Sequence, residues 1–400
     1  MLRNANESTF ITRVVIENYK SIAHCDVRLG PLTFLVGRNG SGKSNFLDAL
    51  AFMADGLRQT LDGAVRAREN IGAISRLRSG YFQPLGVRIE FRLPDGRLGS
   101  YGFEVGGRSI GTAYALSQEV CSIWEPEAEK DAVFFRVRNG QVQSNVPAMP
   151  ATLPRHLYLV NASGIGPFQD VYRALAGMRF YHIDPASIQH TMSDGEDELL
   201  VEDGSNAAGV LLRLSRQRPA VLARIVEYLQ AMVPEILDVA TFKFGSQFSL
   251  SFKQAGAMDG MRFAAPQMSD GTLRALGILL ALFQRTPEDT QFLSLLAMEE
   301  PETGLHRAAL AAMRDAVSEA SETIQILVTT HSTDLLDTKD FDPDWLRVVI
   351  NEGGITRIGP LSEATQSIVR DHLSTAGELL RSSPLRPLVT SGTSATLFNE

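Results

Sequence analysis

Hydrophobic and polar residues follow different periods in different parts of the chain. Residues 32–36 and 178–183 are short, largely apolar runs of the kind that form buried strands. From residue 269 onward, apolar helical segments alternate with short apolar strands, an order typical of a parallel α/β sheet. Residues 84–142 instead alternate between apolar and polar side chains, and turn signals such as the Pro-Asp-Gly run at 94–96 interrupt them. The pattern predicts an α/β core with an antiparallel β meander inserted into it.

A glycine-rich loop follows the first of these apolar runs directly. Residues 37–44 have the spacing G-x-x-x-x-G-K-S, and the pattern predicts a helix from about Ser44 to Leu57. In such a loop, successive backbone N–H groups point at phosphate oxygens, Lys43 reaches the β- and γ-phosphates and the Ser44 hydroxyl binds Mg²⁺. The positive end of the helix faces the same phosphates. The loop therefore predicts a binding site for a nucleoside triphosphate.

Two apolar runs in the C-terminal third end in residues that suit phosphate chemistry. The run 292–298 leads to Glu299 and Glu300, and the run 324–330 leads to His331. The carboxyl ends of parallel strands share one edge of a sheet, where ligands bind. Two adjacent carboxylates can divide the work there, one holding Mg²⁺ and the next polarising the attacking water. Taken alone, the two carboxylates are also compatible with an acidic loop, and a lone histidine at a strand end is more often a cap, but the combination favours an ATPase site.

A Ser-Asp-Gly sequence, residues 269–271, precedes another apolar helix. One interpretation is an ordinary helix cap, because serine and aspartate are common at helix starts. The other is a second phosphate-binding surface, since an exposed hydroxyl and free helix-start N–H groups suit an anion. The sequence of this segment alone leaves both interpretations open.

The bulk composition is that of a soluble globular protein. The 400 residues are 44% hydrophobic and 21% charged, and the net charge of −8 argues against coating nucleic acid by bulk attraction. A local basic groove that contacts nucleic acid is still compatible with the sequence, because eight arginines fall between residues 58 and 97. Solvent-exposed faces of helices and strands are the simpler explanation of these arginines. The two cysteines, Cys25 and Cys121, exclude a disulfide framework and favour a reducing compartment. Without a long apolar run or a leader, we expect a cytoplasmic protein that does not contact membranes.

Taken together, these motifs resemble the ABC-type ATPases of the RecF, SMC and OLD kind. The closest resemblance is to the branch of head-only "predicted ATPases", or AAA family ATPases, of bacterial DNA-repair and phage-defence systems. The matching segments are Ile16-x-Asn18-Tyr19-Lys20-Ser21, residues 37–45, Ser269-Asp-Gly-Thr-Leu-Arg274, Glu299-Glu-Pro-Glu-Thr-Gly-Leu-His306 and Thr329-Thr-His-Ser332. The resemblance is strong over roughly residues 10–60 and 265–335 and weak between them. It implies a P-loop ABC-type ATPase head, with the meander and a helical lobe inserted in the nucleotide-binding core.

The resemblance also implies ATP and Mg²⁺ as cofactors and gives each motif a role. Ser44 and Glu299 would hold Mg²⁺, Glu300 would be the catalytic carboxylate and His331 would contact the γ-phosphate. The residues implied for nucleotide binding are Lys20, Gly37, Arg38, Asn39, Gly40, Ser41, Gly42, Lys43, Ser44 and Asn45. The residues implied to close on the ATP of a second protomer are Ser269, Asp270 and Gly271. The resemblance therefore implies a head-to-head homodimer, or a higher oligomer, with ATP at its interface.

Three positions depart from the family pattern or are hard to assign. Glu299 stands where many ABC proteins have aspartate, although glutamate is usual in this branch. The segment from Ser269 reads Ser-Asp-Gly-Thr instead of Ser-Gly-Gly-Gln. A lid glutamine, which can also bind Mg²⁺, should follow a core strand after the meander, and this favours Gln189 over Gln83 and Gln169.

The same patterns predict the limits of four units. Residues 1–80, 178–190 and 265–360 would form the nucleotide-binding core, and residues 81–145 the antiparallel β subdomain. The helical lobe would span residues 190–264, with a hairpin near its end, and would lead to the Ser-Asp-Gly motif. Residues 361–400 would form a C-terminal helix and tail.

The function expected from these features is that of an ATP-hydrolysing head protein with an ATP-gated dimer. The resemblance implies that it acts on DNA, or with a nuclease or other effector protein, in DNA repair or phage defence. One alternative is a nucleotide-gated scaffold with negligible turnover, because Glu300 makes hydrolysis feasible without making it fast. The other alternative is a transporter nucleotide-binding subunit, although the Glu-Glu-Pro-Glu strand end and the Asn18–Lys20 segment favour the DNA-metabolism branch.

Overall fold

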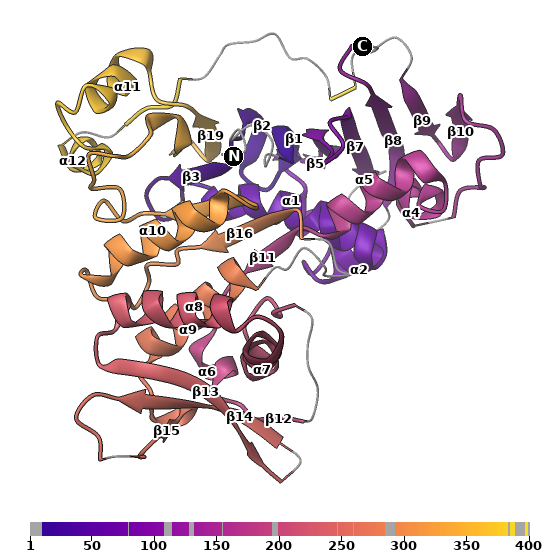
Figure 1. Cartoon of the computed structure of the whole chain (residues 1–400). Coiled ribbons are helices and arrows are strands. Elements are labelled where there is room, and N and C mark those ends of the chain that lie inside the picture. The colour runs from indigo at the N-terminus through magenta and orange to yellow at the C-terminus, as the bar shows by residue number, and fades with distance from the viewer. Residues whose placement is uncertain are drawn as a thin grey trace.

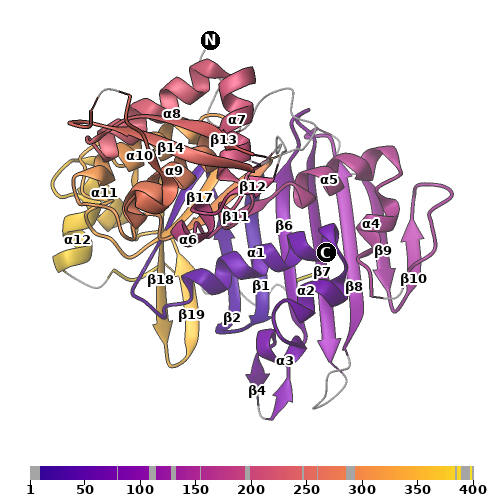
Figure 2. The same cartoon turned by 90° about the horizontal axis from the view of Figure 1, so that it is seen from below.

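The computed structural model describes residues 10–78, 80–107, 114–127, 132–153, 155–193, 199–245, 247–258, 260–284, 293–382, 385–388 and 397–398. Over these residues the chain forms a predominantly parallel core sheet, a large antiparallel sheet and a smaller lobe of helices and short strands (Figure 1). Helix α1 (Lys43–Arg58) packs between the two large sheets, and one hydrophobic cluster joins all three elements (Figure 2).

The core sheet carries the segments that the sequence analysis assigned to the nucleotide site. In spatial order its described strands are β11 (Arg179–Tyr181), β16 (Leu295–Glu299), β17 (Gln325–Thr330), β3 (Leu32–Val36), β18 (Leu346–Glu352) and β19 (Ile355–Gly359). Neighbours are parallel from β11 to β18, and only β19 is antiparallel. The carboxyl ends of β3, β16 and β17 therefore meet at one edge, with β17 between the other two.

The antiparallel sheet is larger than the predicted meander. In spatial order its described strands are β10 (Gln141–Ser144), β9 (Val133–Arg138), β8 (Tyr114–Trp124), β7 (Leu98–Gly107), β6 (Leu85–Arg92), β1 (Ile11–Tyr19) and β2 (Ile22–Arg28). Strands β1 and β2 precede the phosphate loop in the chain, yet they extend the meander beyond β6. The small β4 (Leu77–Arg78) and β5 (Tyr81–Phe82) form a separate hairpin beside it.

The lobe between the core strand β11 and the Ser-Asp-Gly motif combines helices with a small sheet. Its elements are α6 (Pro185–Ile188), α7 (Ala207–Gln217), α8 (Pro219–Met232), β12 (Met192–Ser193), β13 (Ile236–Phe244), β14 (Gln247–Gln254) and β15 (Phe263–Ala264). The hairpin expected near the end of this segment is present as β13 and β14. The almost wholly apolar α9 (Asp270–Phe283) then runs beneath α8 back to the core and is buried along most of its length.

The remaining helices cover the sheets and the C-terminal edge. They are α2 (Leu61–Arg66), α3 (Ile71–Ile74), α4 (Tyr158–Ala162), α5 (Gly166–Ala176), α10 (Ala309–Ser321), α11 (Glu363–Arg370) and α12 (Ala376–Ser382), and short 3₁₀ turns span Ala265–Gln267 and Pro343–Trp345. Helices α11 and α12 lie beside the core sheet, on the opposite side of the molecule from the meander (Figure 1).

Candidate functional site

The phosphate loop takes its shape from two glycines that no other residue could replace without strain. A side chain at Gly37 would come within 2.1 Å of the Val349 carbonyl oxygen on β18. Gly42 has φ +105°, and a Cβ there would lie 2.0 Å from Thr356 Oγ1. The loop thus folds tightly against β18 and β19 before α1 starts at Lys43.

A short chain of hydrogen bonds supports the loop from behind. Thr356 Oγ1 donates to the Ser41 carbonyl oxygen at 2.9 Å and lies 2.7 Å from Ser21 Oγ. Asn45 Nδ2, from the first turn of α1, donates to the same Ser21 Oγ at 2.6 Å. The turn between β1 and β2, strand β19 and helix α1 therefore fix the backbone whose N–H groups would face a phosphate.

Lys43 is folded back over its own loop. Its Nζ donates to the carbonyl oxygens of Gly37 at 2.8 Å and Arg38 at 3.3 Å, and lies 3.8 Å from Glu300 Oε1. Only 5% of the side chain is exposed, and burial lowers the pKa of Lys43, while Glu300 opposes this shift. The ammonium group is positioned over the loop, and only neutral carbonyl groups accept its hydrogen bonds.

Ser44 and Glu299 meet where the sequence analysis expected the metal. Ser44 Oγ, one residue into α1, donates to Glu299 Oε2 at 3.0 Å, and Glu299 is the last residue of β16. A hydroxyl and a carboxylate oxygen at this separation are hard oxygen donors of the kind Mg²⁺ prefers. The pair therefore suits a cation that would also bind phosphate oxygens.

Glu300 adopts a backbone conformation that is rare for a non-glycine residue. Its φ is +41°, and its N–H donates to the Thr329 carbonyl oxygen at 2.9 Å, which ties it to the end of β17. Such left-handed conformations cost about 1–3 kcal/mol and cluster at functional sites. The bend directs the carboxylate at His331, whose Nδ1 lies 3.1 Å from Glu300 Oε1.

These groups surround a cavity of about 420 Å³ at the edge of the core sheet. Its lining consists of residues 39–45 together with His182, Arg274, Glu299, Glu300 and Thr303. Of these, His182 and Thr303 were not singled out from the sequence, and Arg274 was noted only as the end of a motif. His182 directly follows β11, which pairs in parallel with β16, so the rule that ligands gather at carboxyl strand ends could have found it.

The glutamines considered for the lid position lie away from this cavity lining. Gln189 is the half-buried residue that ends α6, seven residues beyond His182. Gln83 donates to the Tyr81 carbonyl oxygen beside the small hairpin, and Gln169 lies in α5. Among the described residues, His182 is the one directly after the core strand β11 that lines the cavity.

Lys20 and the Ser-Asp-Gly motif also lie outside the lining of this cavity. Lys20 Nζ is 2.5 Å from Asp48 Oδ2 on α1, an ion pair that holds the lysine beside the helix. Ser269 caps α9 by accepting the Thr272 N–H at 3.2 Å, and both Ser269 and Asp270 are exposed. One turn further along α9, the side chain of Arg274 reaches the cavity.

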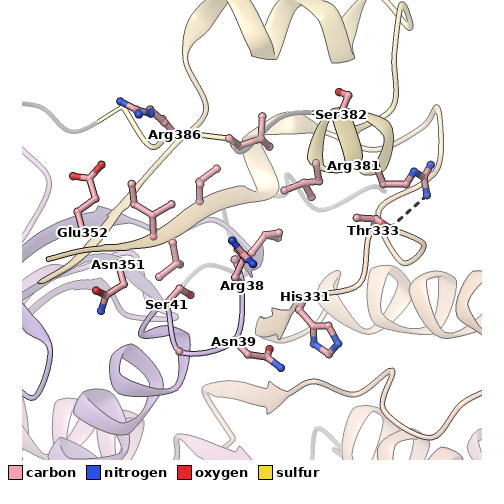
Figure 3. A pocket seen from close by; sticks show the side chains of 18 residues that line it. Arg38, Asn39, Ser41, His331, Thr333, Asn351, Glu352, Arg381, Ser382 and Arg386 are labelled. Atoms are coloured by element: carbon pink, nitrogen blue, oxygen red, sulfur yellow. Dashed lines mark hydrogen bonds between the residues drawn. The ribbon is translucent and has the colours of Figure 1, made fainter. Parts of the chain in front are cut away.

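A second cavity, of about 820 Å³, lies on the other side of the phosphate loop (Figure 3). Arg38, Asn39 and His331 line it from the loop side, and α12 closes it opposite. Arg381 anchors α12 through ion pairs with Asp337 and, at 3.1 Å, Asp334. The segment after His331 is therefore held between the core sheet and the C-terminal helix.

The residues present fit a nucleotide with Mg²⁺. Ser41 Oγ lines the cavity, is buried and has no hydrogen-bond partner among the described residues. Lys43 Nζ donates to two loop carbonyl oxygens, although an ammonium group has three N–H donors, and Ser44 is already paired with Glu299. Phosphate oxygens would satisfy Ser41 and Lys43, while a cation would fit between the hydroxyl and the carboxylate.

The fold and the order of these groups on the sheet edge define a P-loop ATPase of the ABC type, as expected from the sequence. Residues 32–337 match the protein family described as "AAA domain, putative AbiEii toxin, Type IV TA system". This match spans most of the chain and includes the phosphate loop, the two carboxylates and His331. The chain belongs to this family.

Parts of the chain are similar to proteins named DNA replication and repair protein RecF. The relative from Magnetococcus marinus is 30% identical over 115 residues, and that from Vibrio vulnificus (strain CMCP6) is 31% identical over 106 residues. These matches cover 28% and 25% of this chain, and 29% and 28% of the relatives. The chain thus spans less than a third of the length of the curated relatives it matches.

Solved SMC head domains share the architecture over nearly the whole chain. One, an SMC head bound to the C-winged helix domain of ScpA, has a TM-score of 0.56 at 18% identity and covers 90% of this chain and 100% of that one. Another, from Pyrococcus furiosus, has a TM-score of 0.56 at 13% identity, with 91% and 99% covered. At these identities the likeness concerns the fold, and it confirms the predicted fold class. None of the helices that the structure describes is both long and apolar enough to cross a bilayer.

Proposed function

We propose that this chain is an ATP-hydrolysing head protein whose dimerisation is gated by ATP. The observation that carries the proposal is the convergence of Lys43, Ser44, Glu299, Glu300 and His331 at one edge of the core sheet. Three separate strands deliver these residues, and each arrives with the chemistry that phosphoryl transfer to water needs.

Each residue has a distinct task in this proposal. Mg²⁺·ATP, once bound, supplies the electrophilic phosphorus and a cation that neutralises developing phosphate charge. Lys43 exchanges its loop carbonyl partners for phosphate oxygens, and Ser44 and Glu299 hold the cation. Glu300 orients the attacking water and accepts its proton, and His331 stabilises the γ-phosphate. Preorganised donors of this kind act mainly by electrostatic stabilisation of the transition state.

His182 takes the lid position in the proposed mechanism. It follows β11 and lines the cavity together with Glu299 and Glu300, whereas Gln189 lies outside that lining. An imidazole can accept or donate a hydrogen bond to water at the cation, as a glutamine amide does. Arg274 adds a positive charge from α9 to the same cavity.

The exposed Ser-Asp-Gly motif supports an ATP-gated homodimer. Ser269 and Asp270 lie outside the lining of the cavity of their own chain, although Arg274 on the same helix reaches it. Because Gly271 has no side chain, the start of α9 can lie close to the turn after β16. A Cβ at residue 271 would be 2.6 Å from the Gly304 carbonyl oxygen. The motif is therefore presented beside the acidic turn and is available to the nucleotide of a second copy.

Partner molecules are proposed from the relatives. RecF is named for DNA replication and repair, and the similar SMC heads are bound to a domain of ScpA, so we propose that this head acts with DNA or with a protein effector in repair or defence. The arginine-rich segment gives little support to DNA contact. Arg58, Arg68 and Arg97 are paired with carboxylates, and Arg76 and Arg88 donate to backbone carbonyl oxygens.

The test is ATP turnover by the purified chain, with and without double-stranded DNA, beside Glu300→Gln. Glu322→Gln is the matched control, because Glu322 is an exposed glutamate at the end of α10. Light scattering on the same samples gives the oligomeric state. We expect turnover by the wild type and the control, and an ATP-dependent dimer with little turnover for Glu300→Gln.

Other outcomes would separate the remaining candidates. An ATP-dependent dimer without turnover in the wild type would favour the nucleotide-gated scaffold. Equal turnover by Glu300→Gln and wild type would contradict the assigned catalytic carboxylate. Turnover that rises only with DNA would identify nucleic acid as the ligand class.

A further inference from the structure

A third acidic residue, Glu302, lies behind the two carboxylates already assigned. It is 8% exposed and belongs to the turn that follows β16, in which Leu305 N–H donates to the Glu302 carbonyl oxygen at 3.1 Å. The turn reverses the chain directly after Glu300, and Gly304 completes it with φ +78°. The carboxylate is thereby directed inward, toward the end of β17.

Glu302 holds the start of the segment that carries His331. Its Oε1 accepts hydrogen bonds from the Thr330 hydroxyl and, at 3.3 Å, from the His331 backbone N–H. The Thr330 hydroxyl also accepts the Ser332 N–H at 2.9 Å, so Glu302 and Thr330 together fix the backbone on both sides of His331. Because Thr330 is fully buried, this link forms away from water, where hydrogen bonds to a charged group are strong.

The imidazole of His331 lies between two carboxylates. Its Nδ1 is 3.1 Å from Glu300 Oε1 and 3.9 Å from Glu302 Oε1. A carboxylate only accepts hydrogen bonds, so a proton on Nδ1 would suit these two neighbours and would leave Nε2 for the nucleotide. In the proposed mechanism Glu300 must turn to the attacking water, and His331 would then lose this partner.

We propose that Glu302 is a positioning residue for His331, which fixes the His331 backbone and accepts the Nδ1–H hydrogen bond when Glu300 engages water. This inference rests on the proposed ATPase function, since it assigns a role in that reaction. Glu302 Oε2 is buried without a hydrogen-bond partner among the described residues, so the carboxylate has an unused acceptor besides Oε1. The 3.9 Å distance joins His331 Nδ1 to Oε1, and a movement of the imidazole toward this carboxylate would bring Nδ1 within reach of either oxygen. An unpaired buried oxygen is costly, so a hydrogen bond from Nδ1–H to Oε2 would stabilise that position.

A double-mutant cycle tests this role. We expect Glu302→Ala to lower kcat by about 10- to 100-fold, as is typical when a group that orients a reactive side chain is lost. The affinity for ATP should change by less than about threefold, because Lys43 and the phosphate loop are untouched. In a His331→Ala background, adding Glu302→Ala should lower kcat by no more than about twofold, since its effect is transmitted through the missing imidazole.

Two conservative variants keep the test valid if Glu302→Ala folds poorly. Glu302→Gln retains an acceptor for Thr330 and should recover part of the lost kcat. Thr330→Val preserves shape but removes the hydroxyl, and should lower kcat in the same direction. Its matched control is Thr33→Val, a fully buried threonine on the adjacent strand β3, which should leave kcat near that of the wild type. Thermal unfolding of every variant excludes loss of fold as the cause.

The outcomes distinguish this inference from the proposed function. A wild type that hydrolyses ATP, an inactive Glu300→Gln and a Glu302→Ala within twofold of wild type would overturn only the role of Glu302. If the kcat loss in the double variant equals the product of the losses in Glu302→Ala and His331→Ala, the role of Glu302 would be overturned as well. A wild type without turnover would overturn both proposals.

Discussion

Alanine at residue 42 should destabilise the protein far more than alanine at residue 40, although both glycines belong to the phosphate loop. Both have positive φ, +76° at Gly40 and +105° at Gly42, so each substitution carries a left-handed backbone cost of about 1–2 kcal/mol. The surroundings differ. No atom lies within 4 Å of a Cβ at residue 40, whereas a Cβ at residue 42 would lie 2.0 Å from Thr356 Oγ1 and 2.9 Å from Thr356 Cβ.

The added cost at residue 42 follows from what Thr356 would have to give up. Forcing extra atoms into a packed site typically costs about 1–3 kcal/mol. Displacement of the Thr356 hydroxyl also disrupts its hydrogen bond to the Ser41 carbonyl oxygen and its contact with Ser21, each worth about 1 kcal/mol. The difference between Gly42→Ala and Gly40→Ala should therefore be about 3–5 kcal/mol in the free energy of unfolding.

Urea unfolding without nucleotide, followed by circular dichroism, measures this difference from the two midpoints. Thr356→Ala removes two of the clashing atoms, so its combination with Gly42→Ala should cost less than the sum of the single changes. If the two glycine variants differ by less than about 0.5 kcal/mol, close packing of the loop on β19 is not what requires glycine at residue 42.

Three further outcomes follow from other contacts. Burial raises the pKa of Glu119 to about 7 from its ordinary 4.5, so the folded state binds this proton more tightly than the unfolded state. The free energy of unfolding should thus fall by up to about 3 kcal/mol as pH rises from about 4.5 to 7, and Glu119→Gln should abolish this slope in pH-dependent urea melts. Ser44→Ala removes one proposed oxygen ligand, so the Mg²⁺ concentration for half-maximal turnover should rise about 10-fold, whereas an unchanged Mg²⁺ titration would exclude Ser44 as a ligand. His182→Ala should lower kcat about 10- to 100-fold with little change in ATP affinity, and Gln189→Ala should not; the reverse result would restore Gln189 to the lid position.

Local sequence signals were sufficient to predict the core of the fold. Strand β3, the phosphate loop and α1 were predicted within a residue or two, because an apolar run, a glycine pattern and a helical period follow one another without interruption. Strands β16 and β17 were equally clear as buried apolar runs. In the structure Ser44 donates to Glu299, and both line one cavity with Glu300.

What the sequence could not show depends on contacts between distant segments. Within residues 84–142, strand β8 could not be delimited from the sequence, because Glu119 faces the core in the middle of it and breaks the alternation of apolar and polar residues. That carboxylate accepts N–H groups of Tyr158 and Leu159 at the start of α4, a partner some 40 residues away. The choice of His182 over a glutamine likewise depends on which side chain reaches the cavity, and spacing alone does not determine that.

The balance of charge around the cavity supports the proposal that a cation accompanies the nucleotide. Lys43 is the lysine of this site, and Glu299, Glu300 and Glu302 all interact with it electrostatically. Three carboxylates against the positive charges of Lys43 and Arg274 leave the site negative, and a triphosphate would add several more negative charges. At separations of a few ångströms each like-charge pair costs roughly 1–4 kcal/mol, so Lys43, Arg274 and helix α1 alone would hold ATP weakly. In the proposed site, a divalent cation held by Ser44 and Glu299 would offset the negative charge on the acidic side, where Glu300 would approach the γ-phosphate.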